Sequence, residues 1–420
     1  MGGNVTGRDF RPGRAAAMTF GTRKGELSAA DKAALHRAGS AWTDMGTARH
    51  VAGGPGHSSS AIRCHWRAVR LLGELPVHED TGYLADLGAA WVNLGCALLA
   101  GYPGASPEEA LGAFGSAVEL LGRLPFDANP RFRHNLAAAW MGRGEAFGRI
   151  ETTSGRAAAL HAYGRAIEIA RELPLDERPS FRVLLASCRI NRGNLLQRLS
   201  RHQEAIQEYD ESLSALGSLP RCGHRLASHH AATAWTNRGE ALLCLSDFAG
   251  STAAVESARM ALGQVEGRGL DGPPDAKISL RALCVMARGL ESRMLLQGFA
   301  RGADEVAALS DVAERGLALA FASRDRAPET FDPLIIWFFS FGGRVYGRFQ
   351  PQFLAEYLGE ALSRCQADAE LGAELRAVAR RAAAGTLEGL CRNRIIIAGT
   401  REAERLLSTV RELEGAAANF

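Results

Sequence analysis

Six glycines return along most of the chain at a nearly constant spacing. They lie 49, 49, 49, 46 and 50 residues apart, at Gly46, Gly95, Gly144, Gly193, Gly239 and Gly289. Four residues before them stand Trp42, Trp91, Trp140, Arg189, Trp235 and Val285. A period of this length is typical of stacked helical repeats. Glycine within a helix costs about 1 kcal/mol relative to alanine, so its return at one register indicates a packing role.

A Leu-Pro pair closes each of the first four units. The pairs are Leu75-Pro76, Leu124-Pro125, Leu173-Pro174 and Leu219-Pro220, and each proline stands 19 residues before the next repeat glycine. The first half of every unit is therefore constant in length, as expected of a helix that stacks in register on its neighbours. The fourth unit is three residues shorter between Gly193 and Pro220. We expect the loss in the connector between its two helices.

The second half of each unit carries a small residue, an aromatic residue and another small residue at helical spacing. The sets are Ala110, Phe114 and Ala117, then Ala159, Tyr163 and Ala166, then Ala205, Tyr209 and Ser212. Offsets of four and three residues place each set on one helix face. Small residues opposite the glycine of the first helix would let the two helices approach closely. The aromatic ring would then fill the gap between units.

This order of residues resembles the tetratricopeptide repeat (TPR) family. The segments Ala234-Trp235-Thr236-Asn237-Arg238-Gly239 and Glu204-Ala205…Tyr209…Ser212…Pro220 carry the likeness, which covers roughly residues 28–295. The units are longer than the roughly 34 residues usual for the family. The resemblance implies an all-α, right-handed solenoid of extended helical hairpins that holds a protein segment in its concave groove.

Three regions are expected. Residues 1–27 lack periodicity and are predicted to be a disordered tail, residues 28–298 form the repeat array, and residues 299–420 form a C-terminal helical region that caps it. Helices are predicted to start at Asn129-Pro130 and Arg178-Pro179, with proline as the first helical residue. A capping box is predicted at Ser106-Pro107-Glu108-Glu109. A turn is expected at residues 50–60, and further helices at residues 278–297, 304–322, 352–365, 370–392 and 400–414.

The composition favours a cytoplasmic protein. A net charge of +3 and 23% charged residues give no strong electrostatic partner, so nucleic acid is not favoured. Eight single cysteines without a CxxC pair are typical of reduced thiols. No signal peptide or membrane-length apolar run is expected. Only three lysines against many arginines suggests a GC-rich, bacterial source.

No residues have the spacing that catalysis, a cofactor or a metal requires. Cys222, His224, His229 and His230 are the one cluster of metal-ligating types, but adjacent histidines on a helix point in different directions. The GxGxxG of residues 267–272 is followed by Pro273-Pro274, where a dinucleotide site needs a helix. We therefore expect a non-enzymatic protein without cofactor.

The resemblance implies that polar residues beside the repeat glycines line a groove for a peptide. An amide both donates and accepts hydrogen bonds, so it can pair with an extended backbone of any sequence. Simple hydration of the same residues stays an open alternative. The predicted peptide-binding residues are Asp44, Asn93, Glu145, Asn191, Asn194, Asn237 and Glu240.

The functions of two other groups of residues have alternative interpretations. The aromatic segment 331–349 is either a buried helix or a docking surface through which the chain serves as a regulatory or sensing subunit of an enzyme complex. Its candidate contacts are Phe331, Trp337, Phe338 and Phe341. Arginines directly before the glycine, at Arg143, Arg192, Arg238 and Arg288, would form either a ladder for RNA phosphates or acidic peptides, or packing residues with paired guanidinium groups.

Overall fold

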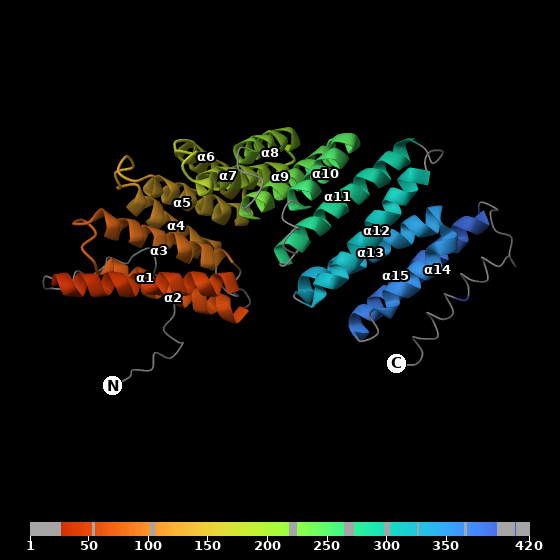
Figure 1. The fold of residues 1–420 in the computed structure, drawn as a ribbon, viewed down its shortest axis with the longest axis horizontal. Coiled ribbons are helices and arrows are strands. Elements are labelled where there is room, and N and C mark those ends of the chain that lie inside the picture. Colours follow the sequence, from red (N-terminus) through yellow and green to blue (C-terminus); the bar gives the residue numbers. More distant parts are fainter. Residues whose placement is uncertain are drawn as a thin grey trace. The chain divides into compact units, whose positions relative to one another are not determined.

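The computed structural model describes residues 27–52, 55–100, 106–217, 225–263, 273–297, 303–325, 327–364, 368–392 and 408. These residues form fifteen α-helices and no strand (Figure 1). They fall into two compact units, Met1–Leu219 and Pro220–Phe420, called unit 1 and unit 2. The predicted tail of residues 1–27 lies, apart from its last residue, outside the described residues, as does the predicted helix at 400–414 except for Ser408.

Unit 1 consists of four helical hairpins that follow one another in chain order. Their helices are α1 (Ala29–Ala52), α2 (Pro55–Gly73), α3 (Thr81–Leu99), α4 (Pro107–Leu121), α5 (Pro130–Arg149), α6 (Thr153–Arg171), α7 (Pro179–Arg198) and α8 (His202–Gly217). Each odd-numbered helix pairs with the even-numbered helix that follows it. The predicted all-α solenoid of TPR-like hairpins is confirmed.

Unit 2 continues with two hairpins and three closing helices. Its helices are α9 (Arg225–Cys244), α10 (Phe248–Gly263), α11 (Pro273–Gln297), α12 (Ala303–Arg324), α13 (Pro328–Phe349), α14 (Pro351–Ser363) and α15 (Ala369–Arg392). The core of unit 2 joins α11 to α15, with Phe331, Phe338, Phe339 and Phe341 at its centre. The predicted division at residue 298 stays a prediction, since α11 and α12 share this core with the C-terminal helices.

Helix starts in unit 1 follow local chemistry. The Asn129 side chain accepts from the backbone N–H of Arg131 at 2.9 Å, with Pro130 as the first helical residue. Ser106 caps α4 by accepting from the N–H of Glu109 at 3.3 Å. These groups satisfy N–H donors that have no partner within the helix. The predicted turn at residues 50–60 is wrong, because α1 runs to Ala52 and α2 already begins at Pro55.

The repeat glycines of unit 1 are explained by the aromatic residue of the same hairpin. A Cβ added at Gly95 would lie 2.7 Å from the Phe114 ring, and one at Gly144 or Gly193 would lie 2.7 Å from Tyr163 or Tyr209. In the first hairpin His65 takes the aromatic place, 2.5 Å from a Cβ at Gly46. The glycine thus gives the ring room to lie directly against the first helix.

The packing around the repeat glycines loosens in unit 2. A Cβ at Gly239 would come no closer than 3.2 Å to Ser251 and 3.3 Å to Val255, and one at Gly289 would find no atom closer than 3.6 Å. Val255 stands where unit 1 has an aromatic residue. The expected reason for glycine therefore holds in the first four hairpins and not at Gly289.

Unit 1 has two layers. In the inner layer α1 contacts α3, α3 contacts α5, and α5 contacts α7, whereas the described even-numbered helices of this unit contact only odd-numbered ones. The surface of α1, α3, α5 and α7 that faces away from the even-numbered helices is called the inner face (Figure 1). Residues beside the repeat glycines lie along it.

Candidate functional site

Two amides of the inner face, Asn93 and Asn191, have no hydrogen-bond partner among the residues that the structure describes. Asn93 on α3 and Asn191 on α7 are half-buried, and neither side chain forms a hydrogen bond with any described residue. They occupy the same register, two positions before Gly95 and Gly193. Asp44 occupies this register on α1, where it is exposed. On α5 the position belongs to Gly142, whose Cβ would clash with Phe114 of the preceding hairpin.

The residues directly after the repeat glycines form more contacts within the protein than Asn93 and Asn191 do. Glu145 pairs with Arg149 one helical turn later at 3.0 Å. The Asn194 Oδ1 lies 2.9 Å from the Tyr209 hydroxyl, which is equally close to Gln197 and can donate to one of them at a time. Tyr209 therefore orients the Asn194 amide from the second helix of the hairpin.

In unit 2 the predicted groove residues are bound by arginines of the next hairpin. The Asn237 side chain is buried, and its Oδ1 accepts from Arg281 of α11 at 3.1 Å. Glu240 pairs with Arg281 at 3.3 Å and with Arg288 at 3.9 Å. Peptide binding at these two residues stays a prediction, and it would require Arg281 to move.

The polar register ends at α11. Ala287 and Leu290 stand where most of the other first helices carry polar residues, and both are buried in the core of unit 2. The helix that follows hairpin five therefore presents no polar row of the kind found on α3 and α7.

The aromatic segment forms the middle of the unit 2 core. Phe331, Phe338 and Phe341 are at most 1% exposed, so the chain's own helices cover all three rings. Trp337 is half-buried and stacks on Phe341 with 5.4 Å between ring centroids. A docking role for α13 stays a prediction, and among these four residues only Trp337 offers surface for it.

The described contacts of the arginines before the repeat glycines are those of packing residues with paired guanidinium groups. The Arg143 guanidinium lies 5.0 Å from the Trp140 ring centroid and 5.5 Å from that of Phe147. Arg238 lies 5.5 Å over Trp235. Arg192 pairs with Glu208 at 2.9 Å. The guanidinium groups of Arg143 and Arg238 thus lie against aromatic faces and that of Arg192 against a carboxylate, and the phosphate ladder stays a prediction.

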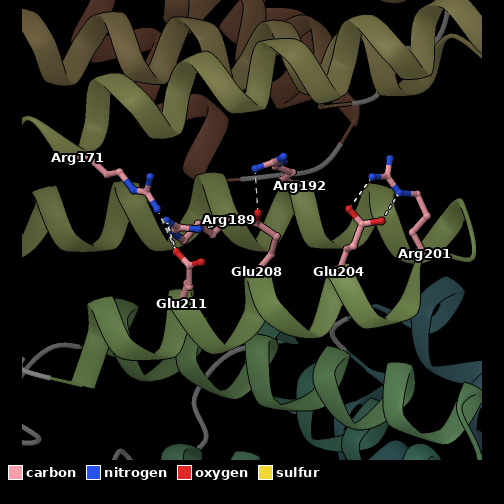
Figure 2. A network of polar contacts seen from close by, with 7 residues as sticks. All are labelled: Arg171, Arg189, Arg192, Arg201, Glu204, Glu208 and Glu211. Carbon is pink, nitrogen blue, oxygen red and sulfur yellow. Dashed lines mark hydrogen bonds and ion pairs between the residues drawn. The ribbon is translucent and has the colours of Figure 1, made fainter.

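A buried ion network in hairpin four was not anticipated. Arg189, 4% exposed, donates to Glu208 at 3.0 Å and pairs with Glu211 at 2.5 Å; Arg171 of α6 reaches the same Glu211 at 3.1 Å (Figure 2). Arg189 stands where most units have tryptophan, and by register Glu208 stands where hairpin three has Ala162. These two departures from the repeat pattern, an arginine in place of tryptophan and a glutamate in place of alanine, are the sequence feature from which the ion pair could have been predicted.

In the first hairpin of unit 1 a histidine, His65, takes the place of the buried aromatic residue. Its side chain is 2% exposed and its Nδ1 has no hydrogen-bond partner among the described residues. Burial, together with the nearby His50 charge, lowers the pKa of His65 to about 4. The imidazole is therefore neutral at pH 7 and packs as an aromatic ring.

Two further features concern metals and membranes. Within the described ranges no group of three or more His, Cys, Asp or Glu residues is placed to hold a metal ion. Cys222 and His224 lie outside those ranges. In the described part of the chain, α3 alone has the length and hydropathy of a membrane span, although 61% of that segment is buried against neighbouring helices.

Comparisons with known proteins give weak likenesses. No protein-family profile matches the chain, and no curated protein sequence is significantly similar to it. Among solved structures, a Rap protein complexed with competence and sporulation factor is 12% identical with a TM-score of 0.43, and the apo form of RapI is 9% identical with a TM-score of 0.46. Both comparisons cover 92% of this chain and 99% of the other.

A third likeness is to a signal-transduction ATPase of the STAND class with a tetratricopeptide repeat sensor, from Pyrococcus horikoshii. It is 12% identical with a TM-score of 0.45, and covers 94% of this chain and 54% of the other. Likenesses at this level carry no argument about function. The assignment to TPR-like hairpins rests on the register of glycine against aromatic residue seen in the structure itself.

Proposed function

We propose that the protein is a non-enzymatic scaffold whose inner face in unit 1 binds an extended peptide segment of a partner protein. The observation that carries the proposal is the pair of amides, Asn93 and Asn191, which share a register and have no hydrogen-bond partner in the described protein. Because both amides are half-buried, water can reach them in the free protein, and a peptide backbone can replace that water with direct hydrogen bonds.

The chemistry of these amides suits a peptide backbone. Each carboxamide offers two donors and one acceptor oxygen, and a backbone offers one donor and one acceptor per residue. Recognition through the backbone tolerates many ligand sequences. Specificity would then come from Asp44 in the same register and from Glu145 and Asn194 in the register directly after the glycine.

The inner face also has room for a chain. One helical turn before the Asp44 and Asn93 register stand four small residues, all half-buried: Ser40, Ala89, Ala138 and Ser187. Because residues four apart lie on the same helix face, this row runs beside the amides. Small side chains there would let a peptide backbone approach the helices closely.

Preorganisation favours Asn194 as a selecting residue. Its amide is oriented by the Tyr209 hydroxyl at 2.9 Å, and Tyr209 itself is fixed by packing on Gly193. A group that is already held in place loses less conformational entropy when a ligand binds.

Affinity capture from the native host tests the proposal. Full-length protein is compared with Asn93→Ala/Asn191→Ala and with Gln203→Ala/Gln207→Ala, which removes two exposed amides from α8 in the other layer. A partner bound by the wild type and by the Gln variant, but lost from the Asn variant, is the expected result. Thermal unfolding should be unchanged, because neither asparagine bonds to the protein.

Retention of every partner by the Asn variant would remove the groove assignment. If that partner were lost instead from Trp337→Ala, docking through α13 would replace it, as expected of a regulatory subunit. Both outcomes are read in one mass-spectrometry experiment.

A further inference from the structure

The outward surface of α2 consists of three arginines. Among residues 58–73 of this helix only Arg63, Arg67 and Arg70 are exposed; all others are half-buried or buried. Spacings of four and three residues place them on one face. The helix contains no aspartate or glutamate. This row of side chains is called the arginine face.

No carboxylate neutralises the arginine face among the described residues, unlike several exposed arginines on other helices of the second layer. Three exposed arginines of other even-numbered helices do pair with a carboxylate three or four residues away: Arg165 with Glu168 at 2.6 Å, Arg259 with Glu256 at 2.5 Å, and Arg315 with Asp311 at 2.9 Å. Arg63, Arg67 and Arg70 have no ion pair with any described residue. Three like charges therefore stand in a row without compensation.

Among the described residues, the elements around α2 hold part of the arginine face rigid and place no free carboxylate against it. Arg67 stacks on Trp42 of α1 with 4.5 Å between its guanidinium carbon and the ring centroid, which fixes its plane. Of the carboxylates on neighbouring segments, Asp86 is held by His36 at 2.6 Å and Glu79 by Lys32 at 2.7 Å. Glu74, just beyond the end of α2, makes no ion pair with Arg70 among the described contacts.

We propose that the arginine face of α2 docks an acidic helix of a partner protein. Arg63 and Arg70 are about 10 Å apart along the axis at 1.5 Å per residue, which matches carboxylates seven residues apart on a facing helix. Charge complementarity of this kind steers association and fixes register. The face lies on the layer opposite the inner face, so both surfaces can be occupied at once.

Three cations in one short row suit a protein better than a nucleic acid. Tight binding to duplex or single-stranded nucleic acid usually draws on about six or more phosphate contacts. The whole chain carries a net charge of only +3. The acidic helix is therefore the occupant that the arginine face fits.

A binding assay with defined probes tests the proposal. A fluorescent helical peptide with glutamate at positions i, i+4 and i+7, its glutamine twin and a single-stranded RNA are titrated with full-length protein at low salt. The variant Arg63→Glu/Arg70→Glu is compared with Arg165→Glu, which reverses a paired arginine on α6. Arg67 is left intact because it packs on Trp42, and circular dichroism verifies the fold of each variant.

The expected result is binding of the glutamate peptide that weakens about tenfold in the double variant and little in the control, since two attractive exposed pairs become repulsive. The milder Arg63→Gln/Arg70→Gln should lie between. Equal affinity for the glutamate and glutamine peptides, or equal affinity in both variants, would overturn the proposal. Tighter RNA binding that the double variant loses would overturn it in favour of nucleic acid.

Discussion

Removal of the Glu208 carboxylate should destabilise unit 1 far more than removal of an exposed acid beside it. Glu208 accepts from Arg189 at 3.0 Å and from Arg192 at 2.9 Å, while Arg189 is 4% exposed. Breaking a buried pair usually costs about 3–5 kcal/mol because the remaining charge is left desolvated. Arg189 keeps Glu211 at 2.5 Å, so we expect a loss near the lower end, about 3 kcal/mol, for Glu208→Ala.

The double variant Arg189→Trp/Glu208→Ala should recover that stability. It introduces into hairpin four the tryptophan and alanine that hairpin three carries at the equivalent positions, Trp140 and Ala162. The helices are in the same register in both hairpins, since Gly144 and Gly193 meet their tyrosines at the same 2.7 Å. Replacing a buried ion pair by packed apolar groups is neutral or stabilises by about 1–4 kcal/mol.

Urea unfolding followed by circular dichroism measures these differences, with calorimetry to detect separate transitions of the two units. Glu204→Ala is the matched control, because Glu204 lies on the same helix as Glu208 and forms an exposed pair with Arg201 (Figure 2), which should contribute little to stability. The reasoning fails if Glu208→Ala unfolds like Glu204→Ala, or if the double variant is no more stable than Glu208→Ala.

Two further variants test packing and pH dependence. Gly144→Ala should destabilise the protein by about 1–3 kcal/mol, because the added Cβ would lie 2.7 Å from Tyr163. Gly164→Ala, where the added Cβ meets open space, should stabilise the protein by up to about 1 kcal/mol. Equal shifts of the two variants in thermal melts would contradict this. The pKa of His65 is about 4 in the folded protein and 6.5 in the unfolded chain. The free energy of unfolding should therefore be unaffected by His65 above pH 6.5 and should fall by about 3 kcal/mol as the pH drops toward 4. His65→Phe should flatten that part of the pH–stability curve, and an unchanged slope would show that the imidazole is not buried neutral.

Much of the fold could be predicted because its signals are local and repeated. Pro130 and Pro179 begin helices, Ser106 caps one, and the glycine-to-aromatic spacing sets the helix pairing of hairpins two to four. The turn expected at residues 50–60 is wrong because Pro55 stands at the first position of α2, where proline begins a helix rather than interrupting one.

The candidate site was harder to predict, because register says which residues share a row and not what each one touches. Asn93, Asn191 and Asn237 look alike in sequence, yet only Asn237 meets an arginine, which comes from 44 residues further along the chain. The ion pair of Arg189 and Glu208 has the same cause: two departures from the repeat are informative only when they are known to face one another. Long-range pairs of this kind depend on the assembled hairpins.

Site-specific photo-cross-linking tests the central claim, a peptide held on the inner face of unit 1. A photoreactive amino acid replaces Cys96, exposed on α3 beside Gly95, or Gly115 on α4 of the same hairpin, where no atom lies within 4 Å of an added Cβ. After capture and irradiation, the account predicts that the partner segment is joined at position 96 and not at position 115. Cross-linking at position 115 alone would contradict it.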